Sequence, residues 1–258
     1  MSTEALSPDA LSPETWRREE LLIAVLARLL DGVEHVAVGA SSPIPGAAAL
    51  LARALSKGAT RVSVLGSRRH NPFTEGGREL FDCAAQGRIG AFFLGGGEID
   101  GEANINLVGM GDYPRLDVRF PGSFGSAYLY MLVPRVILFR EEHSRRVFVP
   151  RVNFISAPGT SEPGVYRPGG PHALVTGLAK FDFDRDRRRF ALASVHPGHD
   201  AAEVAAETGF EYDSPSPVPA TEPPPPEWLE LLRGRIAGEL AETYPKFASA
   251  VFGATAAA

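Results

Sequence analysis

Four carboxylates follow predicted strands and have the chemistry of general bases or nucleophiles: Glu75, Glu98, Asp100 and Glu102. In α/β proteins, ligands bind at the edge where strands end, so catalytic groups gather in such loops. A carboxylate there can remove a proton from water or attack a carbonyl carbon. The spacing singles out none of the four, and the sequence contains no Gly-x-Ser-x-Gly nucleophile motif.

Two glycine-rich stretches have backbone N–H groups suited to an anion. Gly95, Gly96 and Gly97 follow a predicted strand, as phosphate-binding loops do. They lack the spacing of a dinucleotide motif and precede carboxylates, so a tight turn with close backbone packing is the favoured interpretation. The second stretch, Gly122 to Ser126, precedes an apolar run. The backbone N–H groups of this stretch could hold an oxyanion or a phosphate, or the stretch could be an ordinary connection between elements.

The histidines and the cysteine predict no metal site. His196 and His199 are close, but the Pro-Gly pair between them indicates a turn, and no third ligand is evident. Cys83 is the single cysteine, which excludes an internal disulfide and a thiolate-built metal site. The basic stretch 68–70 follows the second predicted strand and is either an anion contact at the sheet edge or solvated charge.

Strands and helices alternate around these residues. The pattern predicts a helix from Pro13 to Leu30 with Ser12 as its N-cap, after a loose tail over 1–13. Short apolar strands then alternate with helices, as in βαβ units. The predicted strands are 35–39, 61–65, 91–94, 135–139, 147–155, 173–183 and 190–195. The other predicted helices are 47–56, 76–86 and 227–243, and a charged hairpin turn is expected at 184–187.

The predicted fold class is α/β, with an open, mixed, largely parallel sheet flanked by helices. Apolar strands without alternation fit a sheet that helices cover on both faces. We expect one main domain over 14–212, followed over 213–258 by a Pro-rich linker and a C-terminal helix.

Composition narrows the class of protein. The 258 residues are 44% hydrophobic and 22% charged, which is typical of a soluble globular chain. The formal net charge of -5 argues against nucleic acid as a partner. The longest apolar stretch, 21–30, contains Arg28 and is too short for a bilayer span, so no membrane association is expected. With one cysteine and no basic, apolar leader, a cytoplasmic location is expected.

Nine short stretches occur in a recognisable order across residues 20–240: 94–100, 104–106, 111–113, 119–123, 145–146, 155–159, 175–182, 195–198 and 208–210. Each is weak alone. Together they resemble the β subunit of the class I CoA-transferase family, both in its glutaconate-type transferases and in its steroid-ring hydrolases.

The resemblance implies an α/β hetero-oligomer acting on acyl-CoA thioesters, with an α subunit as partner. Coenzyme A is then part of the substrate, with no permanently bound cofactor and no metal. The loop of Gly122, Ser123 and Gly125 matches the one that would stabilise the oxyanion, and the pair Gly96 and Gly97 matches a glycine loop near coenzyme A. Phe124 stands where a glycine is usual, which would narrow the acyl pocket.

The resemblance breaks down at the nucleophile. In the family's transferases a glutamate at the end of the second strand attacks the thioester, and the matching position here is Leu65. A leucine cannot form the acyl-enzyme intermediate. Leu65 and Ser67 are then expected to line the substrate pocket, and Glu75 is the nearest downstream carboxylate that could substitute.

Three functional hypotheses follow. The first is a hydrolase- or lyase-type member, in which the partner supplies the catalytic acid. The reactant is then water or a carboxylate. The second is a true transferase with Glu75 or a partner glutamate as nucleophile. The third is a non-catalytic acyl-CoA-binding subunit. In each, Glu98 and Asp100 are expected to shape the site.

Overall fold

A computed structural model describes residues 15–255, and contacts divide the chain into two compact units. Unit 1 combines the chain up to Pro72 with the chain from Pro223 onward, and unit 2 is the continuous stretch 73–222. The tail predicted over 1–13 and the cap predicted at Ser12 lie outside the described residues. The domain boundary predicted at 212/213 stays a prediction. Contacts between Cα atoms group the C-terminal helices with the N-terminal segment in unit 1.

Unit 1 contains two short parallel strands, β1 (His35–Val38) and β2 (Arg61–Val64), as the sequence predicts. They pair in register from His35↔Arg61 to Val38↔Val64. The helix α2 (Pro43–Leu55) connects them and α1 (Arg18–Arg28) packs against it. Because every residue of β1 is buried, its apolar run shows no alternation.

Both helices begin elsewhere than predicted. The predicted start of α1 at Pro13 is wrong: the first helical residue is Arg18, because Glu20 reaches back to the Arg17 N–H (2.8 Å) in a capping-box contact. Helix α2 begins four residues earlier than predicted, at Pro43. Proline is tolerated in a first helical turn, where its missing N–H is not needed.

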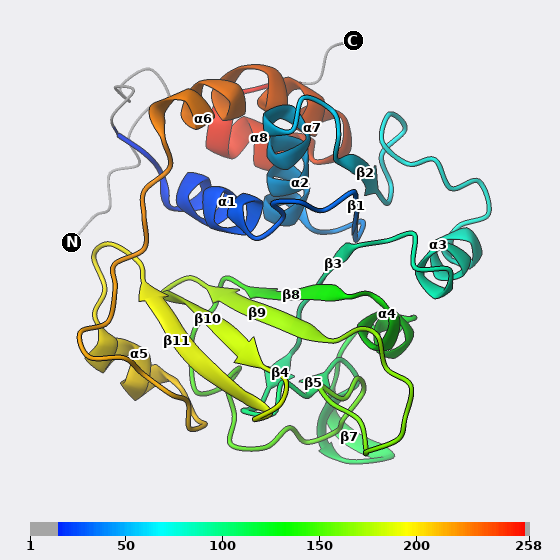
Figure 1. The fold of residues 1–258 in the computed structure, drawn as a ribbon, viewed down its shortest axis with the longest axis vertical. Coiled ribbons are helices and arrows are strands. Elements are labelled where there is room, and N and C mark those ends of the chain that lie inside the picture. Colours follow the sequence, from blue (N-terminus) through cyan, green and yellow to red (C-terminus); the bar gives the residue numbers. More distant parts are fainter. Residues whose placement is uncertain (1–14, 256–258) are drawn as a thin grey trace. The chain divides into compact units, whose positions relative to one another are not determined.

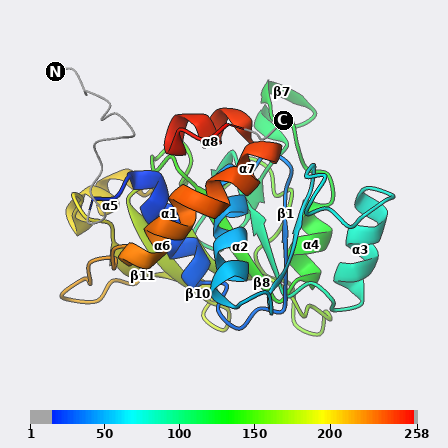
Figure 2. The same ribbon diagram turned by 90° about the horizontal axis from the view of Figure 1, so that it is seen from above.

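The C-terminal helices complete unit 1 (Figures 1 and 2). The chain runs through α6 (Pro226–Leu231), the π-helical stretch η2 (Leu232–Ile236) and α7 (Ala237–Thr243), which confirms the helix predicted over 227–243. All three contact α2. A further helix, α8 (Pro245–Phe252), was not predicted.

A buried ion pair joins the first and last parts of unit 1. Glu20 of α1 is 1% exposed, and its Oε1 lies 2.7 Å from Nε of Arg233 in η2. A buried carboxylate without a cation would be strongly destabilising, so this pair fixes which face of the C-terminal helices meets α1.

The strands β3 (Ala91–Leu94), β8 (Arg135–Arg140), β9 (Pro171–Thr176), β10 (Ala179–Asp184) and β11 (Arg189–Val195) form the main sheet of unit 2 (Figure 1). The strands β3, β8 and β9 pair in parallel, and β9, β10 and β11 pair antiparallel. Three short helices belong to this unit: α3 (Gly77–Ala85), α4 (Ser126–Leu132) and α5 (Ala201–Glu207). Two small two-stranded sheets complete it, β4 (Glu98–Ile99) with β5 (Ile105–Asn106), and β6 (Gly109–Asp112) with β7 (Arg115–Arg119).

Two strand predictions in unit 2 are wrong. The segment 147–155 is irregular, because only Phe148 forms a bridge, to Ile99 of β4, and Pro150 has no N–H to donate to a strand ladder. The predicted strand 173–183 is two strands, since Gly177 and Leu178 form a turn in which the Thr176 hydroxyl accepts from the N–H groups of Leu178 and Ala179. The hairpin turn predicted at 184–187 is confirmed.

The fold class is α/β, with a mixed, mostly parallel sheet flanked by helices, as predicted. Within residues 15–255, no helix combines the length and the apolar character that a bilayer crossing requires.

Candidate functional site

The loop after β2 carries the two predicted pocket residues of unit 1. Leu65 is half-buried, and its N–H donates to the Val38 carbonyl (2.9 Å), so it extends the parallel pairing one residue beyond the strand. Gly66 follows with a φ of +90° and turns the chain. Leu65 therefore lies at the carboxyl end of β2, the edge at which α/β proteins bind ligands.

Ser67 is buried, and its hydroxyl bonds within unit 1. The Oγ donates to Glu242 Oε2 (2.8 Å) and accepts from the N–H groups of Arg69 (3.1 Å) and His70 (3.0 Å). These bonds close the turn 67–70 on itself. Its predicted role as a pocket residue stays a prediction.

Glu242 on α7 is a carboxylate that sequence reasoning missed. Its Oε1 accepts from the Arg68 N–H (2.8 Å), and its Oε2 accepts from the Thr243 hydroxyl (2.8 Å) as well as from Ser67. Burial alone would raise the pKa of Glu242, but these hydrogen bonds lower it to about 2. The side chain is therefore ionised at neutral pH and bound to the loop.

His70, at the end of the same loop, faces a second carboxylate of α7. Its Nε2 lies 3.2 Å from Glu239 Oε2, without the alignment of a hydrogen bond, and its Nδ1 lies 3.1 Å from Nη1 of Arg53. Burial lowers the pKa of His70, and Glu239 opposes that shift. The basic stretch 68–70 is thus joined to α7 at both ends.

In unit 2, the glycine loop after β3 packs tightly against its own chain. A Cβ on Gly96 would lie 2.6 Å from the Glu98 carbonyl and 2.7 Å from Cγ2 of Ile105, and one on Gly97 would overlap the Phe120 ring. The Gly97 N–H donates to the Asn106 carbonyl (2.9 Å). This close packing agrees with the tight-turn interpretation, while the proximity of Gly96 and Gly97 to coenzyme A stays a prediction.

Glu98 lies in β4 and is 1% exposed. Its Oε2 accepts from Nδ2 of Asn106 (2.7 Å) and the N–H of Asn153 (2.8 Å), and its Oε1 accepts from Nδ2 of Asn153 (2.5 Å). Charge-assisted bonds of this kind hold an irregular segment firmly, here the stretch mispredicted as a strand over 147–155. Its effect on a substrate site stays a prediction.

Asp100 forms a second carboxylate–amide group two residues further on. Its oxygens accept from the N–H groups of Glu102 and Asn104 (both 3.1 Å) and from Nδ2 of Asn104 (3.1 Å). Burial raises the pKa of Asp100, and the Asn104 bonds oppose the rise. The two carboxylates therefore fix the stretch 98–106 from both sides.

The loop before α4 presents an aromatic side chain to solvent. Gly125 has a φ of +65°, a left-handed conformation that favours glycine, and its carbonyl accepts from the Leu129 N–H (3.0 Å). Phe124 is 81% exposed, and its ring centroid lies 5.5 Å from that of Phe81. The Ser126 hydroxyl donates to the Ser123 carbonyl (3.2 Å) and closes the loop.

Glu75 precedes α3 and is exposed. Its carboxylate pairs with Arg78, and its N–H donates to Glu79 Oε2 (3.0 Å). A Cβ on Gly77 would lie 2.9 Å from the Phe124 ring, so the start of α3 touches the loop before α4. The structure thus brings the segment of Glu75 beside Phe124, while its role as a nucleophile stays a prediction.

A buried histidine–threonine network lies beside β9 and β11. His143 is within 2.8 Å of Oγ1 of Thr176 through Nδ1 and within 2.9 Å of Oγ1 of Thr208 through Nε2. His196 lies 2.8 Å from Oγ1 of Thr221, which places the Pro-rich segment against β11. Burial lowers the pKa of His143 to about 4, and His196 adds to the shift.

The network predicts a loss of stability in acid. Because the folded pKa of His143 lies below the value of about 6.5 expected on unfolding, its contribution is complete above pH 6.5 and is lost as the pH falls toward 4. Between pH 7 and pH 4 we expect the free energy of unfolding to fall by up to about 3 kcal/mol through this group. Denaturant unfolding of wild type and His143→Gln over that range measures it. Equal pH slopes for the two proteins would contradict the assignment.

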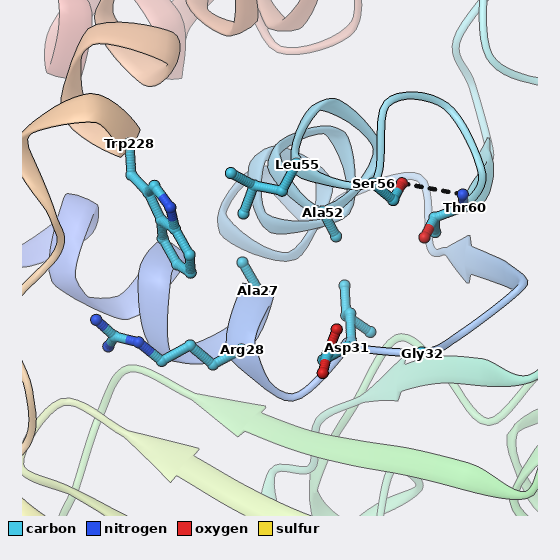
Figure 3. A pocket seen from close by; sticks show the side chains of 10 residues that line it. Ala27, Arg28, Asp31, Gly32, Ala52, Leu55, Ser56, Thr60 and Trp228 are labelled. Carbon is cyan, nitrogen blue, oxygen red and sulfur yellow. Dashed lines mark hydrogen bonds between the residues drawn. The ribbon is translucent and has the colours of Figure 1, made fainter.

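Of the pockets, one lies apart from the candidate carboxylates and another includes two of them, Asp100 and Glu102. One, of about 410 Å³, lies among α1, α2 and α6 (Figure 3), with the Arg28 guanidinium 5.3 Å from the Trp228 ring centroid. The other, of about 600 Å³ in unit 2, is lined by Asp100, Gly101, Glu102, Asn104, Pro150, Arg151, Ile155, Gly209, Phe210 and Glu211. In the described part of the chain, no three His, Cys, Asp or Glu side chains are grouped to hold a metal ion.

The sequence profile of the family described as coenzyme A transferase matches residues 20–207. The chain is 33% identical over 162 residues to the B subunit of 3-oxoadipate CoA-transferase from Pseudomonas knackmussii, covering 60% of this chain and 62% of that protein. It is 31% identical over 160 residues to the cholesterol ring-cleaving hydrolase IpdB subunit of Rhodococcus jostii, with the same coverage. This chain thus spans about three fifths of the length of these curated relatives.

Among solved structures, the decarboxylase AibA/AibB is similar, with a TM-score of 0.70 and 26% identity. The match covers 92% of this chain and 99% of that chain. The similarity therefore extends over both units and through the C-terminal region that the family profile leaves unmatched.

Proposed function

Since this chain belongs to the coenzyme A transferase family, we propose that it is the β-type subunit of a heteromeric enzyme acting on acyl-CoA thioesters. Its relatives include the B subunit of a CoA-transferase and an IpdB subunit, and AibA/AibB supports a two-chain assembly. The partner is an α-type subunit. Coenzyme A enters as part of the substrate, and thioester chemistry requires no permanently bound cofactor.

The reaction we propose is hydrolysis or a lyase step, and Leu65 carries this choice. The side chain at the carboxyl end of β2 is an alkyl group, and the residues that follow it, Gly66 and Ser67, bear no carboxylate. Glu242 approaches this loop, but both its oxygens accept hydrogen bonds and its pKa is about 2, which makes it a poor nucleophile. The relatives include both reaction types, so their names do not decide the question.

The chemistry then needs a base and an oxyanion site. In the hydrolytic case, an ionised carboxylate of the partner acts as general base and takes a proton from water, and the hydroxide adds to a carbonyl carbon of the acyl group. The backbone N–H groups of Gly122, Ser123 and Gly125 are the proposed donors to the oxyanion. As the intermediate collapses, the bond beside the carbonyl breaks and the leaving carbon takes the proton. No covalent bond to this subunit forms.

The experiment starts from the tagged chain purified from its own source. Native mass spectrometry should find a second chain of comparable size in fixed ratio. The purified assembly is then given a panel of acyl-CoA thioesters in ¹⁸O-labelled water, with and without acetate as acceptor. Label in the product without need of acetate supports hydrolysis.

Two outcomes would redirect the proposal. Acetate-dependent exchange, together with inactivation by hydroxylamine only when acyl-CoA is present, would identify a transferase with Glu75 or a partner glutamate as nucleophile. Binding of acyl-CoA with all turnover retained by the isolated partner would identify a non-catalytic subunit.

Phe124 is predicted to limit the size of the acyl group. Its exposed ring projects from the proposed oxyanion loop, so Phe124→Gly should widen the site. We expect the ratio of kcat/KM for a bulky over a short acyl-CoA to rise about tenfold. Val118→Ala, an exposed apolar residue of β7, is the control and should leave the ratio unchanged. An unaltered ratio in Phe124→Gly would remove Phe124 from the acyl pocket.

A further inference from the structure

The C-terminal helices pack on the edge of unit 1 where β1 and β2 end. The hydroxyl of Tyr244, between α7 and α8, donates to the carbonyl of Gly39, the residue after β1 (3.2 Å). A Cβ on Gly46 in α2 would lie 2.9 Å from the Tyr244 ring. Because these helices lie beyond the residues matched by the family profile, that profile does not describe what covers this edge.

The contact continues onto the loop after β2. Glu242 accepts from the Ser67 hydroxyl and from the Arg68 N–H, one bond to each oxygen. Ser67 Oγ in turn accepts from the N–H groups of Arg69 and His70. One carboxylate therefore directly or indirectly holds three consecutive backbone N–H groups.

A second acid on the same helix face supports this arrangement. Glu239 lies one helical turn before Glu242 and 3.2 Å from His70, and Arg235 Nε is 2.6 Å from the other Glu239 oxygen. The Val64 N–H donates to the His70 carbonyl (2.8 Å), which closes the loop back onto the end of β2. The loop 65–70 is thus bound at its middle and at its end by α7.

We propose that Glu242 is a positioning residue that holds the loop 65–70 in the conformation that presents Leu65 to the acyl-CoA substrate. The inference rests on the proposed function for the role of Leu65, and on the hydrogen bonds alone for the role of Glu242. The helix α7 is then part of the catalytic arrangement, although Glu242 itself touches neither substrate nor reacting atoms.

The first test is hydrogen exchange of peptides covering 64–71, measured by mass spectrometry on the full chain. Glu242→Gln keeps the shape but replaces one acceptor oxygen with a donor group facing N–H and O–H donors. We expect exchange at residues 68–70 to rise about 10- to 100-fold. Glu242→Asp keeps the charge and should restore part of the protection. Glu230→Gln, at an exposed position on α6, is the control and should leave the loop unchanged.

The second test is kinetic, on the assembly with its partner and an acyl-CoA that it turns over. Glu242→Gln should lower kcat about tenfold with KM within about twofold, and Glu242→Asp should recover part of kcat. A fall in the amount of folded protein alone would not produce that rescue together with an unchanged KM. If Glu242→Gln does not fold, Ser67→Ala removes one of the two bonds to Glu242 from the loop side, and it is read by hydrogen exchange at residues 69 and 70.

The outcomes separate the two proposals. Unchanged exchange at 68–70 in Glu242→Gln overturns the positioning role, and so does increased exchange with unchanged kcat. A wild-type assembly that turns over no acyl-CoA overturns the proposed function, while the exchange experiment still decides whether Glu242 holds the loop.

Discussion

Replacing Gly96 with alanine is expected to destabilise unit 2 by about 2–4 kcal/mol. The added Cβ would lie 2.6 Å from a backbone carbonyl and 2.7 Å from a buried isoleucine. Real Cβ atoms do not approach that closely, and neither neighbour can move aside easily: the carbonyl belongs to Glu98, which three hydrogen bonds hold, and Ile105 is fully buried.

Thermal or denaturant unfolding measures the loss in Gly96→Ala. The matched control is Gly122→Ala, in the other glycine-rich loop, because nothing lies within 4 Å of a Cβ placed there. The control should unfold within about 0.5 kcal/mol of wild type. Equal stability of Gly96→Ala and Gly122→Ala would show that the loop after β3 can relax, contrary to the packing described.

Replacing Glu98 with alanine is expected to cost about 3 kcal/mol and to lower turnover as well. The substitution leaves the buried Asn106 amide, and the N–H and side-chain amide of the exposed residue Asn153, without their acceptor, and unmade bonds to buried donors are costly. The segment 150–153 then loses its attachment to β4. A drop in melting temperature of roughly 6–12 °C corresponds to that free energy in a protein of this size.

Glu98→Gln distinguishes charge from shape. The variant keeps the volume of the side chain but places an amide donor against amide donors. We therefore expect its melting temperature to lie between those of Glu98→Ala and wild type. The control is Glu102→Gln, in the following turn. Glu102 bonds to Asp100 through its backbone N–H, which the substitution keeps. If Glu98→Ala leaves melting temperature, kcat and KM all unchanged, Glu98 neither holds the segment nor shapes the site.

Local sequence signals were sufficient for some of the regular elements. The strands at 35–38, 61–64, 91–94 and 135–140 are short apolar runs, so the hydrophobic pattern alone locates them. The same signal misled at 147–155, where Val147, Phe148 and Val152 are buried but only Phe148 forms a bridge, to Ile99 of β4. Burial of apolar residues is common to strands and to irregular core segments, and only the pairing segment distinguishes them.

The candidate site was harder to predict because its parts are far apart in sequence. The Ser67–Glu242 bond joins residues 175 positions apart, and nothing in the sequence pattern of α7 distinguishes Glu242 from the other acid of that helix, Glu239. Glu98 was selected for its place after a strand, but its two asparagine partners were not identified as such. Short-range motifs locate loops, whereas hydrogen-bond partners depend on topology.

The discontinuous make-up of unit 1 has a consequence for the order of events during synthesis. Residues 73–222 form unit 2 as an uninterrupted stretch, so every segment of unit 2 has been synthesised before residue 226 is added. Unit 1 must wait, because Glu20 obtains Arg233 and Ser67 obtains Glu242 only after the whole of unit 2 has been translated. Until then, the Glu20 carboxylate lacks its cation, and the loop that turns at Gly66 lacks its acceptor on α7. Long-range closure of this kind is intrinsically slow, and the helix that completes the edge near Leu65 is made only after the whole of unit 2.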